Sequence, residues 1–497
     1  MAKAIMVQGT ASNVGKSLLV AGLCRIFRQD GHSVAPFKSQ NMALNSFITR
    51  EGLEIGRAQV VQAEAAGIEP SVLMNPILLK PTGEATSQVI VDGEVAATMG
   101  AAEYYARKAE LIPVVRRAYA TLASRHDILV IEGAGSPAEI NLAENDIVNM
   151  GMAALAEAPV LLVGDIDRGG VFASLYGTVA LLPETDRARI KGVIVNKFRG
   201  DVEILRPGLS RLEELVKAPV LGVVPMLYLD IDDEDSLSSR LGAKRTTKPV
   251  DVAVVRLPRI SNFTDFAALD HDSNLGVRYV SRVGELARPD LVILPGTKNT
   301  MADLAWLRQN GLEAAIKKLV ADGIPLIGIC GGYQMLGETL CDPDGVEQGG
   351  GMRGMALLPV ETRFARKKIR TRVAGAVGAL NGFFACLDGV AFEGYEIHMG
   401  ETKRPDTLGS FARITGDGRD VEDGAVAASV LGSYVHGLFD SGAIAKRLGE
   451  AILSARGESP ESAATDTFAS YKERQYDLLA DALRGALDMD AIYAILG

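Results

Sequence analysis

Short apolar runs alternate with longer helical stretches along the first half of the chain. Each run has the length of one strand: KAIMVQG (3–9), HSVAPFK (32–38), DILVIEGAGS (127–136), PVLLVGDID (159–167), IKGVIVNKF (190–198) and PVLGVVP (219–225). Near-continuous apolar strands separated by helices are typical of a parallel sheet covered on both faces. The pattern predicts an α/β domain over residues 1–230.

A polar, charged stretch interrupts this pattern. The residues YLDIDDEDSLSSRLGAKRTTKPV (228–250) show no apolar period and predict a linker over 231–249. A second α/β domain is expected over 250–442, with runs VDVAVVRLP (250–258), PDLVILPGT (289–297), IPLIGICGG (324–332), GYEIHMG (394–400) and GSYVHGLF (432–439). Apolar residues spaced by three and four then predict a helical C-terminal segment over 443–497.

Composition and net charge argue against several classes of protein. The 497 residues are 47% hydrophobic and 23% charged, as expected for an ordered chain of several domains. The net charge of -10, without a long Lys/Arg tract, argues against nucleic-acid binding. No apolar run is long enough to cross a membrane. Because the four cysteines are scattered, we expect no disulfide framework and a cytoplasmic protein; the number of subunits stays open.

The first run leads into a glycine-rich turn and a helix, SLLVAGLCRIF (17–27). Backbone N–H groups of such a turn, together with the helix N-terminus, form a nest for phosphate oxygens. Lys16 would contact the outer phosphates, and the Ser17 hydroxyl would bind Mg2+. We therefore expect phosphate groups to contact Gly9, Thr10, Asn13, Gly15, Lys16 and Ser17. The alternative is a structural turn without a ligand.

A magnesium site also needs a carboxylate at the end of a neighbouring strand. Glu132 occupies that position in DILVIEGAGS, where the small residues that follow would let a ligand approach. Asp165 and Asp167 of GDID are the second candidates. Each of these acids could instead be an ordinary solvated residue at a strand end.

The second half contains a pattern typical of a nucleophile at a strand-to-helix turn. An apolar strand runs into Gly328-Ile329-Cys330-Gly331-Gly332 and then a helix, and the helix N-terminus favours a thiolate at Cys330. The N–H groups of Gly331 and of Gly296 are expected to form an oxyanion hole. His436 of YVHGLF is the preferred base, and His398 is the second candidate.

An ordered set of motifs now identifies a resemblance. The chain resembles the cobyric acid synthase family of glutamine-dependent amidotransferases. The motifs are PFKSQNMALNS (36–46), EIGRAQVVQAEAAG (54–67), MNPILLKP (74–81), EGAGSPAEINL (132–142), GDIDRGGVFAS (164–174), NKFRGD (196–201), LPGTKNT (294–300) and GICGGYQMLG (328–337). Five residues separate Gly9 from Gly15, and this loop resembles that of dethiobiotin synthetase and its relatives.

The resemblance implies an ATP-dependent ligase domain followed by a class I glutamine amidotransferase domain. The implied reaction uses ATP, Mg2+ and glutamine to amidate four peripheral carboxylates of a corrinoid, adenosylcobyrinic acid a,c-diamide. By the same resemblance Lys38 would contact phosphate, and Asn196 would contact adenine.

Two positions depart from related enzymes. Class I glutaminases carry Glu two residues after the histidine, but position 438 is Leu, so the group that orients His436 is open. Relatives of dethiobiotin synthetase place a metal-binding Asp where this chain has QNMALNS (40–46), so part of the metal shell is open too. The alternatives are a cobyrinic acid a,c-diamide synthase, an ATPase switch of the partitioning type, and a C-terminal domain that is an inert interaction module.

Overall fold

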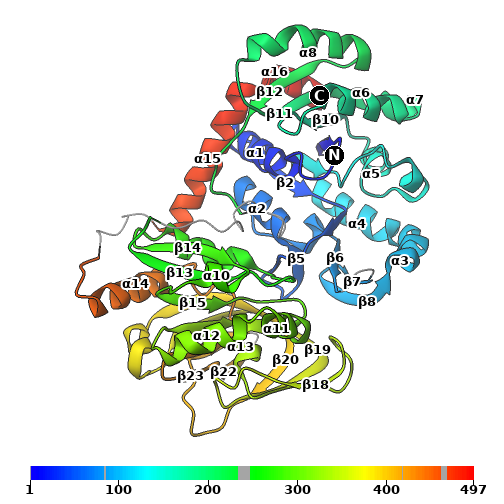
Figure 1. Ribbon diagram of the computed structural model, residues 1–497. Helices are drawn as coiled ribbons and strands as arrows, with labels where there is room; N and C mark the ends of the chain where they lie inside the picture. Colours follow the sequence, from blue (N-terminus) through cyan, green and yellow to red (C-terminus); the bar gives the residue numbers. More distant parts are fainter. Residues whose placement is uncertain (1, 83–85, 233–246, 417, 461–466) are drawn as a thin grey trace. The chain divides into compact units, whose positions relative to one another are not determined.

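The computed structural model describes residues 2–82, 86–232, 247–416, 418–460 and 467–497, and the chain forms two compact units (Figure 1). Unit 1 contains Met1–Ala43, Glu54–Asp232 and Lys472–Gly497, and unit 2 contains Leu44–Leu53 and Asp233–Tyr471. Most of the linker expected at 231–249 lies outside the described residues. Each unit is built around a mainly parallel sheet, so the predicted α/β class is confirmed.

The main sheet of unit 1 has the order β12-β11-β10-β1-β9-β2, and all its strand pairs are parallel. Its strands are β1 (Lys3–Gly9), β2 (Val34–Phe37), β9 (Ile128–Glu132), β10 (Val160–Asp165), β11 (Ile190–Phe198) and β12 (Val220–Pro225). The chain runs from β1 to the β2 edge, returns to β9, and then crosses to β10. The turn after β1 therefore lies where the strand order reverses, which is where open α/β sheets bind ligands.

Helices cover both faces of this sheet. Val163 of β10 packs in the same core as α1 and α15, whereas a Cβ at the next residue, Gly164, would lie 2.8 Å from Val171 of α6. Successive strand residues face opposite sides, so α1 and α6 cover different faces. The helices of this unit are α1 (Lys16–Gln29), α2 (Arg57–Ala66), α3 (Ala101–Arg107), α4 (Ile112–Ala123), α5 (Met150–Leu155), α6 (Val171–Leu181), α7 (Glu184–Arg187), α8 (Val202–Val216), α15 (Phe468–Ala486) and α16 (Met489–Leu496).

A second, smaller sheet in unit 1 follows the order β3-β6-β7-β8. Its strands are β3 (Gln40–Met42), β6 (Ile77–Pro81), β7 (Thr86–Val91) and β8 (Glu94–Gly100), and β5 (Glu54–Gly56) precedes α2. Asn75 lies just before β6, where its amide nitrogen donates to the backbone oxygen of Lys38 at 3.1 Å. This hydrogen bond fixes the segment that carries Lys38 from β2 into β3.

The main sheet of unit 2 has the order β14-β13-β15-β16-β24-β23, in which β23 alone among these strands is antiparallel to its neighbour. Its strands are β13 (Val250–Val255), β14 (Leu275–Val280), β15 (Leu291–Leu294), β16 (Leu326–Ile329), β23 (Ala425–Ala427) and β24 (Val430–Ser433). The helices are α9 (Ala267–His271), α10 (Val283–Leu286), α11 (Thr300–Gln309), α12 (Leu312–Ala321), α13 (Gly331–Leu336) and α14 (Ala443–Ala455).

Unit 2 also contains a largely antiparallel sheet that the sequence did not predict. It is formed by β17 (Thr339–Asp342), β18 (Gly350–Arg353), β19 (Glu361–Val377), β20 (Ala391–Lys403), β21 (Ala412–Gly416) and β22 (Arg419–Asp423). The run 394–400, expected as part of the second α/β series, lies in β20 and pairs with β19 here. Alternating exposed and buried residues along β19 explain why this sheet buries one face only.

The compact units divide the chain differently from the expected domain boundaries. The helical segment expected at 443–497 is shared, because α14 belongs to unit 2 and α16, with most of α15, belongs to unit 1. Residues 44–53, which include β4 (Ser46–Ile48), belong to unit 2 although the sequence on either side belongs to unit 1.

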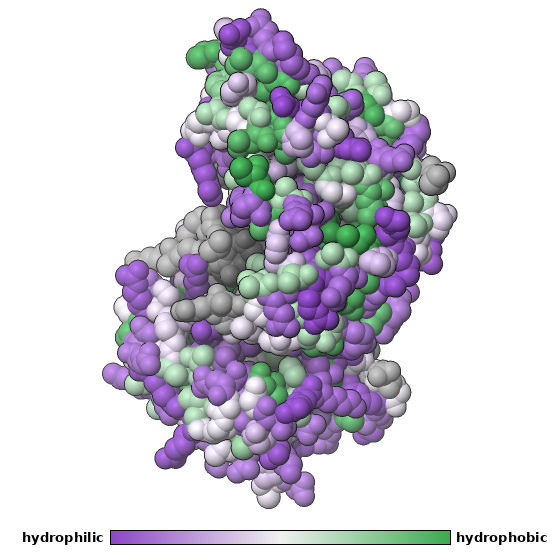
Figure 2. All heavy atoms as spheres, turned by 90° about the vertical axis from the view of Figure 1, so that its right-hand side faces the viewer, coloured by the Kyte–Doolittle hydropathy of each residue, from purple (hydrophilic) through white to green (hydrophobic). Residues whose placement is uncertain are grey.

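The surface is mainly polar on the face shown in Figure 2, where apolar residues are scattered among charged ones. Exposed large apolar side chains of unit 1 include Ile140, Phe172 and Ile204. Within the described ranges, no helix has the length and apolar character needed to cross a membrane.

The packing of α15 on α1 generates a test of the unit 1 core. Leu483 of α15 is fully buried, and its Cδ1 atom would lie 2.2 Å from a Cβ placed at Gly22 of α1. Leu483→Ala should lower the free energy of unfolding by about 2–5 kcal/mol through loss of this burial. Hydrogen exchange of the amides in β1 and α1 measures the effect in this unit. Leu478→Ala, 50% exposed on the same helix, is the matched control; equal effects of both substitutions would contradict this packing.

Candidate active sites

The turn after β1 is too tightly packed to accept side chains at its glycines. Gly15 has a φ of 97°, and a Cβ at this position would lie 2.2 Å from the amide nitrogen of Asn196. A Cβ at Gly9 would lie 2.5 Å from Val14. Asn196 donates to the backbone oxygen of Val14 at 2.8 Å, and Lys197 donates to that of Asn13 at 2.5 Å. The end of β11 therefore supports the loop from one side, and Asn196 contacts the loop itself.

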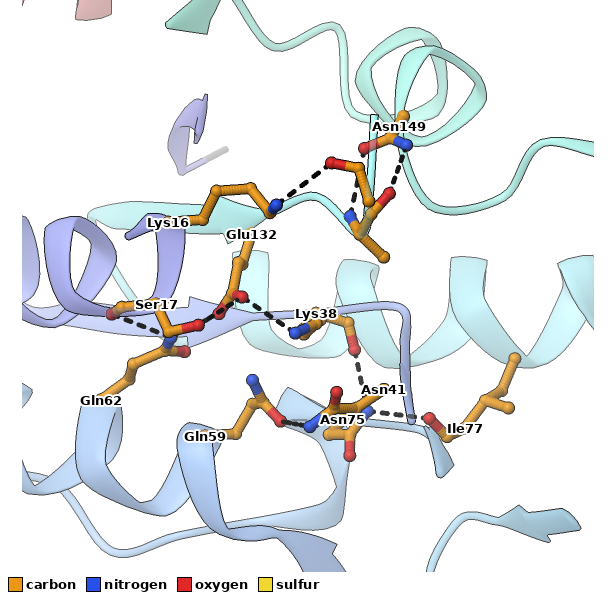
Figure 3. A network of polar contacts seen from close by, with 12 residues as sticks. Lys16, Ser17, Lys38, Asn41, Gln59, Gln62, Asn75, Ile77, Glu132 and Asn149 are labelled. Atoms are coloured by element: carbon orange, nitrogen blue, oxygen red, sulfur yellow. Dashed lines mark hydrogen bonds and ion pairs between the residues drawn. The ribbon is translucent and has the colours of Figure 1, made fainter. Parts of the chain in front are cut away.

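Lys16 is the first residue of α1, and its side chain reaches the segment that follows β9 (Figure 3). Its Nζ atom donates to the backbone oxygen of Ala11 at 2.9 Å and to that of Gly135 at 3.1 Å. The ammonium group is therefore held at the mouth of the loop by neutral carbonyl groups. The loop, with its backbone N–H groups and this cation, has the donor set that phosphate oxygens require.

At the end of β9, the Glu132 carboxylate accepts hydrogen bonds from three side chains, as Figure 3 shows. Its Oε1 atom accepts hydrogen bonds from Ser17 Oγ and Lys38 Nζ, both at 2.8 Å. Its Oε2 atom accepts one from Gln62 Nε2 at 2.6 Å. The carboxylate is only 1% exposed. Because a hydroxyl and a carboxylate oxygen meet here, the residues fit a hard cation such as Mg2+.

The two aspartates named as second metal candidates occupy a different place. Asp165 ends β10, on the other side of β1 from Glu132, and accepts a hydrogen bond from Lys197 at 2.8 Å. Asp167 pairs with Arg199 at 3.0 Å. Among the described residues, no three His, Cys, Asp or Glu side chains form a metal cluster. Ser17 and Glu132 are thus the predicted metal residues that the structure brings together.

In unit 2, Cys330 occupies a strained turn between β16 and α13. Its φ is 51° and its ψ is -107°, a conformation that costs of order 1–3 kcal/mol. A Cβ at Gly332 would lie 2.0 Å from the backbone oxygen of Leu294. A Cβ at Gly328 would lie 2.8 Å from the backbone of Gly332. The flanking glycines are therefore required by close backbone approach.

Asp265 orients His436, and sequence reasoning missed it. One carboxylate oxygen lies 2.6 Å from His436 Nδ1, and the other accepts the N–H of Gly437 at 3.2 Å. This contact leaves Nε2 as the nitrogen available to Cys330. Asp265 follows β13, so it lies at the same carboxyl edge of the parallel sheet as Cys330; that topology was the available signal. Leu438, where relatives have Glu, is buried.

The electrostatics favour a protonated His436. Burial lowers the pKa of this imidazole, but the Asp265 carboxylate and Cys330 outweigh burial and raise the pKa to about 10. The contribution of Cys330 to this shift places the sulfur close to the imidazole. Cys330 and His436 therefore interact electrostatically.

His398, the second candidate base, has different partners. Its Nδ1 atom lies 2.7 Å from the backbone oxygen of Gly400, and its ring stacks on Tyr434 with centroids 3.8 Å apart. Its Nε2 atom lies 3.6 Å from Glu396. These contacts are those of a side chain packed in place on β20.

The two residues expected in an oxyanion hole border the cysteine and the histidine. Gly331 is the first residue of α13, so its N–H has no partner within the helix. A Cβ at Gly331 would lie 3.1 Å from the backbone nitrogen of Thr297. A Cβ at Gly296 would lie 3.0 Å from His436 Cε1. The structure thus brings Gly296, Gly331, Cys330 and His436 to one place.

Comparison with known proteins finds a different family for each half of the chain. A family described as CobQ/CobB/MinD/ParA nucleotide binding domain matches residues 5–236. A family described as CobB/CobQ-like glutamine amidotransferase domain matches residues 251–444. The cobyric acid synthase of Ruminiclostridium cellulolyticum is 58% identical over 100% of this chain and 97% of its own length. The chain belongs to the cobyric acid synthase family.

Further relatives show the same full-length match. The cobyric acid synthase of Yersinia enterocolitica is 52% identical over 99% of this chain and 98% of its own length.

A solved glutamine amidotransferase structure is 20% identical, covers 41% of this chain and 98% of its own, and has a TM-score of 0.31. A nucleotide-binding domain and a glutamine amidotransferase domain in one chain are the parts of a glutamine-dependent amide ligase.

The contact between Asp265 and His436 generates a titration test. The 15N NMR signals of His436 should show a protonated imidazole through neutral pH, with a midpoint near 10. The stability that this contact adds should be complete below the unfolded pKa of about 6.5 and should be lost as pH rises through the folded value. Asp265→Asn removes the raising charge, so the midpoint should fall.

His126 is the internal control for this titration. Burial and Arg125 lower its pKa below the usual range, and Asp265→Asn should leave its signals unchanged. A wild-type His436 that titrates near 6.5, or one that is insensitive to Asp265→Asn, would contradict the proposed electrostatics.

Proposed function

We propose that this chain uses ATP and glutamine to amidate the b, d, e and g carboxylates of adenosylcobyrinic acid a,c-diamide, which gives adenosylcobyric acid. The presence of two sites in one chain is the main support for this proposal. One site contains Cys330, His436 and Asp265, and the other contains the phosphate loop with Lys38 and Glu132. Full-length relatives named cobyric acid synthase support the choice of acceptor.

The ligase site would activate a carboxylate, which is otherwise a poor electrophile. An oxygen of the corrinoid side chain attacks the γ-phosphorus of ATP, and ADP leaves with the bridging oxygen. Lys16, Lys38 and the N–H groups of the loop stabilise the negative charge of the transferring group. Mg2+, held by Ser17 and Glu132, would supply further neutralisation of the phosphates. The product of this step is an acyl phosphate.

Ammonia then attacks the acyl carbon, phosphate leaves, and the nitrogen loses a proton to give the amide. Ammonia in neutral water is largely protonated and therefore not nucleophilic, and water would hydrolyse the acyl phosphate. Release of ammonia from glutamine by the same protein avoids both losses. This requirement explains why a glutaminase domain and a ligase domain occur in one chain.

The glutaminase site would work through covalent catalysis. The Cys330 thiolate attacks the amide carbon of glutamine, and the N–H groups of Gly331 and Gly296 stabilise the oxyanion. His436 donates its proton to the leaving ammonia and later takes one from the water that hydrolyses the thioester to glutamate. Asp265 is a positioning residue, because it holds the imidazole and its charge.

The alternative functions differ in what they require of these sites. A partitioning ATPase needs no cysteine nucleophile, whereas residues 251–444 match a glutamine amidotransferase family. A cobyrinic acid a,c-diamide synthase would share both sites, so only the identity of the amidated carboxylates separates it from the proposed enzyme. An inert C-terminal module would not hydrolyse glutamine.

Cys330→Ala separates the two halves of the proposed reaction. Glutamine hydrolysis and glutamine-dependent amidation should vanish, because the nucleophile is absent. Amidation from added ammonium should persist and rise with pH as more ammonia is unprotonated. Product mass measures amidation, and glutamate release measures hydrolysis. Cys341→Ala, at an exposed residue of β17, is the matched control. Loss of both activities in a folded Cys330→Ala protein that binds ATP would contradict this division.

Lys16→Ala should abolish amidation from either nitrogen source. Both routes need the acyl phosphate, and loss of this cation should slow its formation by roughly 10²–10³-fold. ADP release in the presence of corrinoid and ammonium measures the step. The control is Lys191→Ala, an exposed lysine on β11. Retention of wild-type ADP release in Lys16→Ala would remove this lysine from the mechanism.

A further inference from the structure

Four buried amide side chains lie together on one side of the Lys38 and Glu132 pair, and the proposed mechanism does not use them (Figure 3). Gln62 bonds Glu132, and Asn75 bonds the backbone of Lys38. Asn41 and Gln59 complete the group, and Gln59 is fully buried. Burial of an amide is costly unless its polar atoms are hydrogen-bonded. Any unpaired amide atom in this cluster therefore calls for a ligand.

Gln62 Oε1 and Gln59 Nε2 are such atoms, and Gln59 Nε2 is the donor of the two. Asn41 Nδ2 donates to Gln59 Oε1 at 3.0 Å, which leaves Nε2 as the other end of the amide. Within the described part of the chain, Gln59 Nε2 has no hydrogen-bond partner. Figure 3 shows this nitrogen pointing toward the side of the cluster on which Lys38 and Glu132 lie. A buried donor thus faces the phosphate site.

The orientation of Gln59 is enforced by packing. A Cβ at Gly56 would lie 2.7 Å from Asn41 Nδ2, 2.9 Å from Gln59 Oε1 and 3.0 Å from Asn75 Oδ1. The glycine therefore gives three amides room to pack around one point. Gln59 is the third residue of α2, and helical side chains lean toward the helix N-terminus. The first-turn N–H groups there have no intrahelical partners, which adds positive potential near Nε2.

We propose that Gln59 Nε2 donates a hydrogen bond to the corrinoid carboxylate that is being activated. This inference rests on the proposed function, because it names the group that holds the acceptor at the same site. A neutral amide suits this task. An arginine would engage both oxygens of a carboxylate and reduce their nucleophilicity, whereas one N–H group positions one oxygen and leaves the other to attack phosphorus. Asn41 is then a positioning residue for Gln59.

Two substitutions test the donor. Gln59→Glu keeps the shape and an oxygen for Asn41 but places an anionic oxygen where the donor stood. Gln59→Met keeps similar length and removes the donor. With ammonium as the nitrogen source, KM for the corrinoid should rise by about tenfold in Gln59→Met, the loss of one hydrogen bond to a charged group, and further in Gln59→Glu. In Gln59→Met, which adds no charge beside the phosphate site, affinity for ATP and the rate of glutamine hydrolysis should stay within about twofold of wild type.

Equilibrium binding of the corrinoid should weaken by the same factors, and thermal unfolding confirms that each variant is folded. Asn41→Ala, which frees Gln59 to rotate, should raise KM by a smaller factor and serves as the second variant if Gln59→Glu does not fold. An unchanged KM in folded Gln59→Met overturns the assignment. Wild-type protein that binds corrinoid but does not amidate it overturns the proposed function instead, and absence of binding overturns both.

Discussion

A single buried carboxylate, that of Glu132, organises the nucleotide-binding unit. Ser17 comes from the helix after the phosphate loop, Lys38 from the end of β2, and Gln62 from α2, and all three donate to this one group. A buried carboxylate without a partner strongly destabilises the folded state, and removal of one partner from a buried pair typically costs about 3–5 kcal/mol of stability. Glu132 therefore sets the spacing among α1, the segment after β2 and α2.

The amidotransferase unit uses the same principle with a different cation. Asp265 holds His436 as Glu132 holds Lys38, and in both cases a carboxylate at the end of a parallel strand or in the loop beyond it fixes a positive side chain. The strained backbone at Cys330 is stabilised by close packing of Gly328 and Gly332. Each unit thus fixes these charges in advance, and in the proposed reactions this would lower the reorganisation that each step needs.

Sequence reasoning missed β14 and β23 of the unit 2 sheet. Local patterns in the sequence predicted most of the other strands of the two main sheets, the glycine-rich turn after β1 and the turn at Cys330. These features depend on neighbouring residues: apolar runs, glycine spacing and a following helix. Asp265 was missed because its partner His436 lies 171 positions away, and only the sheet order brings them together. The resemblance implied a role for Lys38, but nothing in its spacing indicated contact with Glu132. The division of the C-terminal helices between the units also depends on packing, as Leu483 on Gly22 shows.

We propose that nitrogen released at Cys330 reaches a carboxylate activated at the phosphate loop of the same protein. Wild-type protein can be incubated with ATP, Mg2+, amide-15N glutamine, adenosylcobyrinic acid a,c-diamide and an excess of unlabelled ammonium at neutral pH, and the corrinoid product analysed by mass spectrometry. Transfer within the protein should give four new amides that carry mainly 15N, with one ADP and one glutamate formed per amide. Product that carries mainly unlabelled nitrogen, or glutamate and ADP formed without corrinoid amide, would contradict it.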